Sequence, residues 1–300
     1  MTRERSLRIG FIGPGTVGRA LAQGFASNGY RVTSLFGRNP DRLASAVSHV
    51  PGAIAVRSAQ DVVDRSNLIF LTVPDDAIES VAEGLVWRED ISAVHCSGVA
   101  STGFLLPAAR AGASTGAFHP LQTLATVEQA LRNLSGSTFA IEASTPRLEE
   151  ILCELASAVG GHPVTIDGSK ALYHASAVLA SNCLVTLVDA AAGLWDHLGL
   201  SKEEGLRALL PLIRGTIENL EAVGLPKALT GPVSRGDLGT VEANLKALQS
   251  VSPEAAALYA DMALRTIPVA RAKGTLDSES EARLRSALAE IQPEQRKEGV

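Results

Sequence analysis

A glycine-rich segment near the start of the chain limits the possible folds most strongly. The stretch RIGFIGPGTVGRALA places Gly13, Gly15 and Gly18 in a GxGxxG arrangement, between a short apolar run and an amphipathic stretch. There the first glycine permits a tight turn, the second lets a pyrophosphate approach the backbone, and the third packs a helix against a strand. A glycine turn that binds no ligand would have the same spacing, but the context favours a dinucleotide site. The predicted cofactor-binding residues of this loop are Gly13, Pro14, Gly15, Thr16, Val17 and Gly18.

The first half of the chain alternates short apolar runs with helical stretches. LRIGFIG, RVTSLFG, LIFLTVP and ISAVHCSG are β-rich and end in glycine, proline or small polar residues, and weaker strands follow at TGAFHP, STFAIEA and HPVTID. Runs that are apolar throughout suit strands covered on both faces, and strands alternating with helices indicate a parallel sheet. The predicted fold class is α/β, a Rossmann doubly wound, mostly parallel sheet followed by an all-α C-terminal domain.

The strand signals stop at Asp167. Helices are predicted over 169–198, 201–223, 238–249, 253–272 and 278–290, with Ser252 as an N-cap and Pro253 in the first turn. We therefore predict an NAD(P)-binding Rossmann domain over 1–167. An all-helical substrate and dimerisation domain with a polar C-terminal tail is predicted over 168–300.

Composition and charge exclude several classes of protein. The net charge of −5 argues against a partner with a phosphate backbone, so no nucleic acid is expected. Three cysteines at unrelated spacings form neither a disulfide framework nor a zinc pattern, and no metal site is predicted. The N-terminus lacks the apolar stretch of a signal peptide, and the most apolar long segment contains His, Asn and Ser residues that a membrane span would disfavour. A cytoplasmic protein with no membrane partner is expected.

The end of the second strand indicates which dinucleotide binds. An NAD site usually has an acidic residue there for the ribose 2′-hydroxyl, whereas SLFGRNPDR has none before Arg38. A guanidinium matches a 2′-phosphate, so NADP is favoured over NAD, the alternative being a solvated basic turn. Val73, Pro74 and Asp75 follow the fourth strand and should border the cofactor, because ligands bind beyond the carboxyl ends of such strands.

Three further segments contain candidate substrate-binding residues. Ser97 and Gly98 end the strand in AVHCSGVAS, where a hydroxyl and bare amides could hold a carboxylate or carbonyl. His119 follows the strand in TGAFHPLQT, although a lone histidine is as often structural. In the loop LTGPVSRGDLGT, Arg235 is an anion-binding candidate and Asp237 a helix cap that could pair with it.

The segment DGSKALYHASAVLASN combines an apolar helix with a polar stripe. At about 100° per residue, Lys170, His174 and Ser181 lie within about 40° of one another, with Asn182 at the border of the stripe. Polar groups on such a helix suit the wall of a catalytic cleft, because burying them without partners costs free energy. The alternative is the solvated side of a surface helix.

The motifs FHPLQT, LYHASAVLASN and TGPVSRGD resemble a family of oxidoreductases that join a Rossmann-like domain to a domain of unknown function, DUF 2520. This family lies within the 6-phosphogluconate dehydrogenase-like superfamily, with the β-hydroxyacid dehydrogenases, ketopantoate reductases and pyrroline-5-carboxylate reductases. The resemblance implies a catalytic lysine at Lys170, with His174 where β-hydroxyacid dehydrogenases have asparagine. It also implies substrate contacts at Ser97 and Gly98, and a homodimer formed through the long apolar helix.

Together these features predict an NADP-dependent oxidoreductase that reduces a small anionic carbonyl or imine compound by hydride transfer. Lys170 or His174 would stabilise and protonate the product. The predicted substrate-binding residues are Ser97, Gly98, His119, Asn182 and Arg235. A catalytically silent, NADP-sensing dimer is the alternative, and a pyrroline-5-carboxylate reductase is disfavoured because its Ser/Thr-Gly-Ser-Gly-Pro segment is absent.

Overall fold

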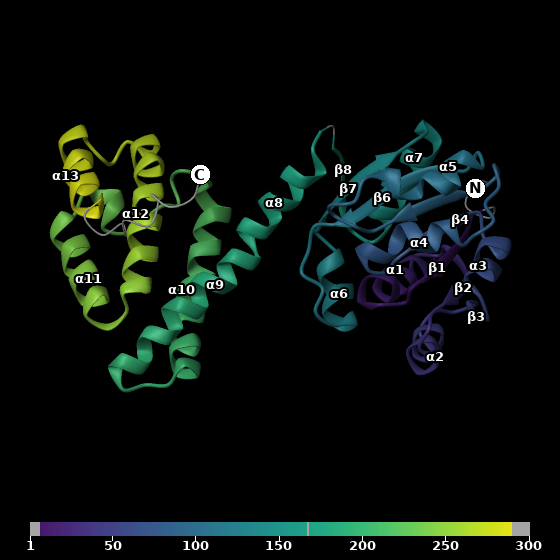
Figure 1. Ribbon diagram of the computed structural model, residues 1–300, viewed down its shortest axis with the longest axis horizontal. Helices are drawn as coiled ribbons and strands as arrows, with labels where there is room; N and C mark the ends of the chain where they lie inside the picture. The colour runs from purple at the N-terminus through teal and green to yellow at the C-terminus, as the bar shows by residue number, and fades with distance from the viewer. Residues whose placement is uncertain (1–6, 167, 290–300) are drawn as a thin grey trace. The chain divides into compact units, whose positions relative to one another are not determined.

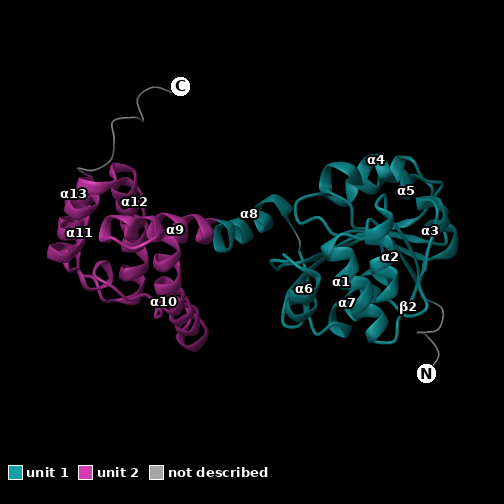
Figure 2. Ribbon diagram, turned by 90° about the horizontal axis from the view of Figure 1, so that it is seen from below, with its two compact units in different colours: residues 1–182 teal, residues 183–300 magenta. Residues whose placement is uncertain are grey.

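The computed structural model describes residues 7–166 and 168–289 (Figure 1). Asp167, where we predict the domain boundary, and the predicted polar tail after residue 289 lie outside the described residues. The chain divides into two compact units, residues 1–182 and residues 183–300 (Figure 2). The division falls after the helix that follows the last strand, because the polar stripe of that helix contacts the sheet unit.

The first unit contains one eight-stranded sheet in the order β3-β2-β1-β4-β5-β6-β7-β8. Every pair of neighbouring strands is parallel except β6 and β7. The predicted doubly wound, mostly parallel sheet is therefore confirmed. The strands are β1 Arg8–Ile12, β2 Arg31–Phe36, β3 Ile54–Ala55, β4 Leu68–Leu71, β5 Ser92–His95, β6 Ser114–Pro120, β7 Thr138–Ala143 and β8 His162–Thr165.

Helices cover both faces of this sheet (Figure 2). One face is covered by α1 Thr16–Ser27, α2 Pro40–Ser48, α6 Val127–Leu134 and α7 Pro146–Ala158. The other is covered by α3 Ala59–Arg65, α4 Ile78–Glu83 and α5 Leu106–Arg110, with short 3₁₀ turns η2 Asp75–Ala77 and η3 Thr102–Leu105 before the last two. Although aromatic residues make up only 4% of the chain, the first face encloses five buried phenylalanines in mutual contact. They are Phe11, Phe25, Phe70, Phe118 and Phe139.

The second unit is helical, as predicted. Helices α11 Leu238–Val251, α12 Pro253–Lys273 and α13 Ser278–Ala289 enclose a small core that includes Val241, Ile267 and Leu284, and the turn η5 Val233–Arg235 packs against it. The hydroxyl of Ser252 accepts a hydrogen bond from the Ala255 amide, so the predicted N-cap of α12 is confirmed.

The helix predicted over 169–198 has internal structure. It consists of α8 Lys170–Ala180, a turn at Ser181, α9 Asn182–Gly193 and the 3₁₀ turn η4 Leu194–Leu198, and α10 Lys202–Val223 follows. The segment Lys170–Leu198 is long and apolar enough to cross a membrane by length and composition alone. A core helix of a soluble protein passes the same test, but little of this one is buried in the structure.

Candidate active site

The glycine-rich loop has the shape that a dinucleotide requires. Gly13 has φ +91°, and a Cβ atom there would lie 2.7 Å from Val73 Cγ1, so only glycine fits. Thr72 Oγ1 donates a hydrogen bond to the Gly13 carbonyl (2.6 Å) and ties the loop to the end of β4. Gly15 begins α1 without a side-chain cap, and a Cβ atom there would meet no atom within 4 Å. The open space at the helix N-terminus fits the pyrophosphate of NADP.

The end of β2 adjoins this loop. The Gly13 amide donates a hydrogen bond to the Phe36 carbonyl (2.9 Å), and a Cβ atom at Gly37 would lie 2.7 Å from Pro14 Cδ. Arg38 comes next in the chain and is exposed. The chain thus offers a cation, and no carboxylate, directly after the strand whose end touches the glycine-rich loop, which fits the 2′-phosphate of NADP.

The loop after β5 is held by the hydroxyl of Ser97. This hydroxyl donates to Asp75 Oδ2 (2.7 Å) and accepts from the amides of Val99 (3.2 Å) and Ala100 (3.0 Å). Three hydrogen bonds use its donor and both of its acceptor sites. Ser97 therefore fixes the conformation of this loop. Asp75, which we predict to border the cofactor, is hydrogen-bonded to the loop through Ser97.

His95 is also hydrogen-bonded to the loop after β5. Its side chain is fully buried, and Nδ1 accepts a hydrogen bond from the Ser97 amide (3.2 Å). Within the part of the chain that the structure describes, Nε2 has no hydrogen-bond partner. Burial, reinforced by the charge of Lys170, lowers the pKa of His95 to about 4, so the ring is neutral near pH 7.

Helix α8 turns its polar stripe toward the sheet. Lys170, Tyr173 and His174 are partly buried, whereas the side chains of Leu172 and Leu179 on the other face are 73% and 70% exposed. This is the reverse of an ordinary amphipathic surface helix. The polar side chains of α8 therefore lie against the rest of the sheet unit. The apolar side chains on the other face of α8 are exposed in the described chain.

Lys170 is held by two groups of the sheet unit. Its Nζ lies 2.7 Å from Glu142 Oε2 and donates to the Ala100 carbonyl (3.1 Å), and Thr102 Oγ1 donates to Glu142 Oε1 (2.8 Å). Burial would raise the pKa of Glu142, but the hydrogen bonds from Lys170 and Thr102 outweigh that effect and lower it. The Glu142 carboxylate is therefore ionised near neutral pH, and its ion pair with Lys170 fixes the start of α8 to β7 and to the loop after β5.

A second contact joins α8 to the end of β6. His119 Nδ1 and Tyr173 Oη share a hydrogen bond of 2.9 Å, and the two rings meet edge to face at 5.6 Å. Burial lowers the pKa of His119 to about 4, with smaller contributions from His174 and Lys170, and burial raises the pKa of Tyr173 to about 12. His119 is therefore neutral near pH 7, and Tyr173 keeps its proton.

Gly98 lies where these groups meet. A Cβ atom at this position would be 2.7 Å from His119 Nε2 and 3.0 Å from His174 Cδ2. The predicted residues Gly98, His119, Lys170 and His174 are thus brought together at the carboxyl ends of β5 and β6, on the same sheet as the glycine-rich loop. Ligands of doubly wound sheets bind at this edge.

Arg235 belongs to the second unit, and no contact joins Asn182 to this group among the hydrogen bonds given above. Arg235 is exposed in η5 of the second unit. The hydrogen bonds from Thr240 lower the pKa of Asp237, and the charge of Arg235 lowers it further by a smaller amount. Asp237 caps α11 through the Thr240 amide (3.1 Å). Asn182 is the first residue of α9 and the last of the first unit. Their assignment to the substrate site stays a prediction.

Sequence reasoning missed Tyr173, Glu142 and Thr102. Tyr173 lies three positions after Lys170, which places it on the same face of a helix, so the spacing could have identified it. Glu142 lies on β7, and nothing in the sequence brings it to Lys170 without the antiparallel pairing of β6 and β7. Among the described residues, no group of three or more His, Cys, Asp or Glu side chains could hold a metal ion.

Fold and site define a Rossmann-type dinucleotide-binding unit joined to a helical unit. Residues 8–94 match the family model described as an NADP oxidoreductase, coenzyme F420-dependent, and residues 137–266 match the domain of unknown function DUF2520. The chain thus has an N-terminal segment of the NADP oxidoreductase type, followed by a DUF2520 segment. None of the curated proteins matches the sequence significantly.

Solved structures with the same fold cover nearly the whole chain. A protein of Thermotoga maritima is 26% identical, with a TM-score of 0.71 over 89% of this chain and 99% of that one. A protein of Bacteroides fragilis, proposed to be an NADP oxidoreductase, is 23% identical, with a TM-score of 0.67 over 88% and 99%. A reductive aminase from Aspergillus terreus in complex with NADPH and ethyl levulinate is 16% identical, with a TM-score of 0.62 over 93% and 98%. Pyrroline-5-carboxylate reductases are also among the matches.

Proposed function

We propose that the protein is an NADPH-dependent reductase of a small carbonyl or imine compound that bears an anionic group. The observation that carries this proposal is the approach of His119 and His174 to Gly98, with Lys170 bound to the Ala100 carbonyl of the same loop, at the same edge of the sheet as a loop shaped for a pyrophosphate. The family match to NADP oxidoreductases supports the cofactor. The reductive aminase, bound to NADPH and an oxo ester, supports the class of reaction.

In this proposal the chain positions both reactants and compensates the charge that develops. Gly13, Gly15 and the first turn of α1 hold the pyrophosphate, and Arg38 holds the 2′-phosphate. When bound, NADPH supplies a hydride at C4 of its nicotinamide ring. Negative charge then develops on the substrate oxygen beside Gly98.

The charges of the site suit that oxygen. The Lys170 ammonium is fixed within the same cluster, and a positioned cation stabilises a developing oxyanion more effectively in a partly buried site than in water. His174 lies against Gly98 and would contact the substrate. Ser97 would act through the shape of its loop, because its hydroxyl is already engaged.

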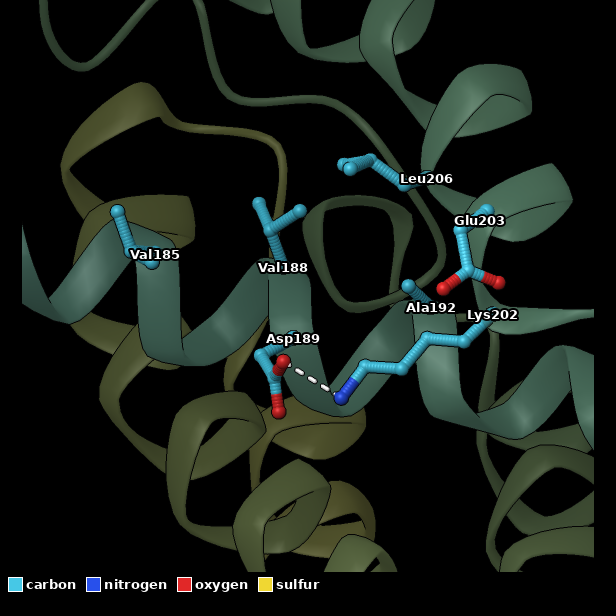
Figure 3. A pocket seen from close by; sticks show the side chains of 7 residues that line it. All are labelled: Val185, Val188, Asp189, Ala192, Lys202, Glu203 and Leu206. Carbon is cyan, nitrogen blue, oxygen red and sulfur yellow. Dashed lines mark ion pairs between the residues drawn. The ribbon is translucent and has the colours of Figure 1, made fainter.

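We further propose a cytoplasmic homodimer that covers the apolar surface of α8, α9 and α10. Residues 170–223 carry twelve of the twenty-one exposed large apolar side chains of the described residues. Within the second unit, α9 and α10 also form a shallow apolar pocket lined by Val185, Val188 and Leu206, with the ion pair Asp189–Lys202 (2.6 Å) at its rim (Figure 3). Apolar surface on this scale marks an interface, and a second copy of the chain offers the matching surface.

The proposal is tested by NADPH oxidation against 2-oxo acids, 3-oxo acids and cyclic imines, with coenzyme F420 as a further acceptor. We expect at least one small anionic compound to be reduced. Lys170→Ala and His174→Ala should each lose turnover while the Kd for NADPH stays within a few-fold. Tight NADPH binding without turnover, together with full tolerance of both substitutions, would instead identify a silent NADP-sensing protein.

A further inference from the structure

The ring of His119 lies between the Tyr173 hydroxyl and Gly98, and its two nitrogens have different surroundings. Nδ1 shares a hydrogen bond of 2.9 Å with Tyr173 Oη, and the two rings meet edge to face. On the other side of the ring, a Cβ atom at Gly98 would lie 2.7 Å from Nε2 and 2.8 Å from Cε1. Nε2 is therefore the nitrogen on the side where we expect the substrate.

Nε2 of His119 is open to a ligand. Within the described chain, the buried side-chain nitrogens without a hydrogen-bond partner are His95 Nε2 and Arg19 Nε. Nε2 of His119 also has no hydrogen bond to a described residue, but it is not one of these buried atoms. It therefore has accessible surface, and a polar atom of the substrate can reach it.

The Tyr173 hydroxyl decides which nitrogen of His119 carries the proton. Burial lowers the pKa of His119 to about 4, so the ring is neutral near pH 7 and has a single N–H. Burial raises the pKa of Tyr173 to about 12, so the hydroxyl keeps its proton. A phenol is a better hydrogen-bond donor than acceptor, whereas the unprotonated nitrogen of an imidazole is a strong acceptor. The favourable arrangement therefore has Tyr173 donate to Nδ1, which leaves the proton of the ring on Nε2.

His95 is a reference for this tautomer. Its Nδ1 accepts a hydrogen bond from the Ser97 amide, which can only donate, so the proton of this neutral ring lies on Nε2. The two histidines differ in what surrounds that proton, because Nε2 is buried in His95 and accessible in His119. Of these two rings, only that of His119 can present its N–H to a ligand.

We propose that His119 donates its Nε2–H to the substrate oxygen and that Tyr173 is a positioning residue, which fixes this tautomer by donating its hydroxyl hydrogen to Nδ1. The inference rests on the proposed function, and it assigns Tyr173 a role that neither matched family model nor the sequence pattern gives it.

The role of His119 requires no proton transfer from the ring. As the hydride reaches the carbonyl carbon, the π electron pair moves to the oxygen, and the hydrogen bond from Nε2–H strengthens with the growing charge. An imidazolium with an ordinary pKa would lose its charge at a pH of about 6.5. A neutral N–H of fixed tautomer instead remains a donor throughout the neutral range.

The first test moves the N–H group from one side of residue 119 to the other. In His119→Gln the side-chain amide nitrogen can take the place of Nε2, whereas in His119→Asn it can take only the place of Nδ1. With the compound that the wild type reduces fastest, we expect His119→Asn to lower kcat by about 100-fold or more, as for loss of one donor to an oxyanion. His119→Gln should keep at least about tenfold more activity, and the Kd for NADPH should stay within a few-fold in both. Equal kcat values in the two variants would overturn the proposal, and so would wild-type kcat in His119→Asn.

The second test needs no turnover. Nitrogen-15 NMR of the protein without substrate at pH 7 reports which ring nitrogen is protonated, and His119→Gln assigns the signal of residue 119. We expect Nε2–H on both His95 and His119. Tyr173→Phe should raise the ratio of Nδ1–H to Nε2–H in His119 by about two- to tenfold, the factor for one hydrogen bond, and should leave His95 unchanged. Nδ1–H on His119 in the wild type would overturn the proposal, and an unchanged tautomer in Tyr173→Phe would remove the role of Tyr173.

Turnover of the tyrosine variant connects the two tests. Tyr173→Phe should lower kcat by a few-fold, because only part of the molecules then present Nε2–H. Tyr259→Phe should behave as the wild type; the Tyr259 hydroxyl also shares one side-chain hydrogen bond (3.2 Å, from Asn244) but lies in the second unit. Wild-type kcat in Tyr173→Phe despite an altered tautomer would show that this N–H does not act on the substrate. Absence of turnover with every compound, together with Nε2–H on His119, would refute the proposed function and the substrate contact, while the tautomer fixed by Tyr173 would stand.

Discussion

Two glycines in the sheet unit should respond in opposite ways to the addition of one methyl group. At Gly15 a Cβ atom meets nothing within 4 Å, and the backbone, at φ −72°, suits any L-residue. At Gly98 the Cβ atom would lie 2.7 Å from His119 Nε2 and 3.0 Å from His174 Cδ2. The substitutions Gly15→Ala and Gly98→Ala therefore separate cofactor binding from the integrity of the catalytic group.

The expected magnitudes follow from these distances. A contact of 2.7 Å is about 0.8 Å inside an ordinary separation of about 3.5 Å, so at least one histidine ring must move. Over-packing of this kind destabilises proteins by about 1–3 kcal/mol. Gly98→Ala should lower the stability of the sheet unit by this amount, and it should lose turnover with NADPH affinity nearly unchanged. Gly15→Ala should unfold like the wild type but weaken NADPH binding by about tenfold or more, a loss of about 1.4 kcal/mol.

Urea unfolding of the sheet unit measures its stability. Fluorescence titration with NADPH measures the affinity for the cofactor. Each variant is the control for the other, because both add one methyl group to the same unit. Wild-type NADPH affinity in Gly15→Ala would show that the pyrophosphate does not lie over Gly15. Wild-type stability and turnover in Gly98→Ala would refute the close approach of the two histidines.

Three further outcomes are expected. Burial lowers the pKa of both His95 and His119 from 6.5 to about 4. Between these two values each histidine binds a proton in the unfolded chain but not in the folded one. The free energy of unfolding should therefore fall as the pH falls from 6.5 to about 4. The slope should be about 1.4 kcal/mol per pH unit for each histidine, as measured by urea unfolding, and a flat profile would contradict the burial of the rings. Arg38→Asp should lower affinity for NADPH by about tenfold relative to NADH, and an unchanged ratio of the two Kd values would exclude the 2′-phosphate contact. Leu179→Glu should convert the dimer to a monomer in light-scattering chromatography, whereas Val86→Glu, at an equally exposed position (77%), should not; a wild type that is already monomeric would refute the dimer.

Much of the fold could be predicted from the sequence, because local pattern and tertiary structure agree in the first half of the chain. Apolar strands with glycine or proline at their ends identify a sheet that is covered on both faces, and GxGxxG marks the loop after β1. The break of the long helix at Ser181 could not be predicted, because an apolar sequence of Ala, Val and Leu continues on both sides of it.

The contacts within the site could be predicted only where both partners lie on one element. The stripe of Lys170 and His174 follows from helical periodicity. Glu142 enters through the pairing of β6 with β7, and the engagement of the Ser97 hydroxyl depends on Asp75 from another loop. Such partners depend on contacts between segments far apart in the chain, which no local pattern encodes.

The most direct measurement of the central claim is transfer of deuterium from NADPH labelled at C4 of the nicotinamide. The protein is incubated with each C4 epimer of the labelled cofactor and the panel of oxo acids and cyclic imines, and the products are analysed by mass spectrometry. We expect one deuterium in the reduced product of a small anionic compound, from one epimer only. NADPH that binds tightly but transfers deuterium to no compound of the panel would contradict it.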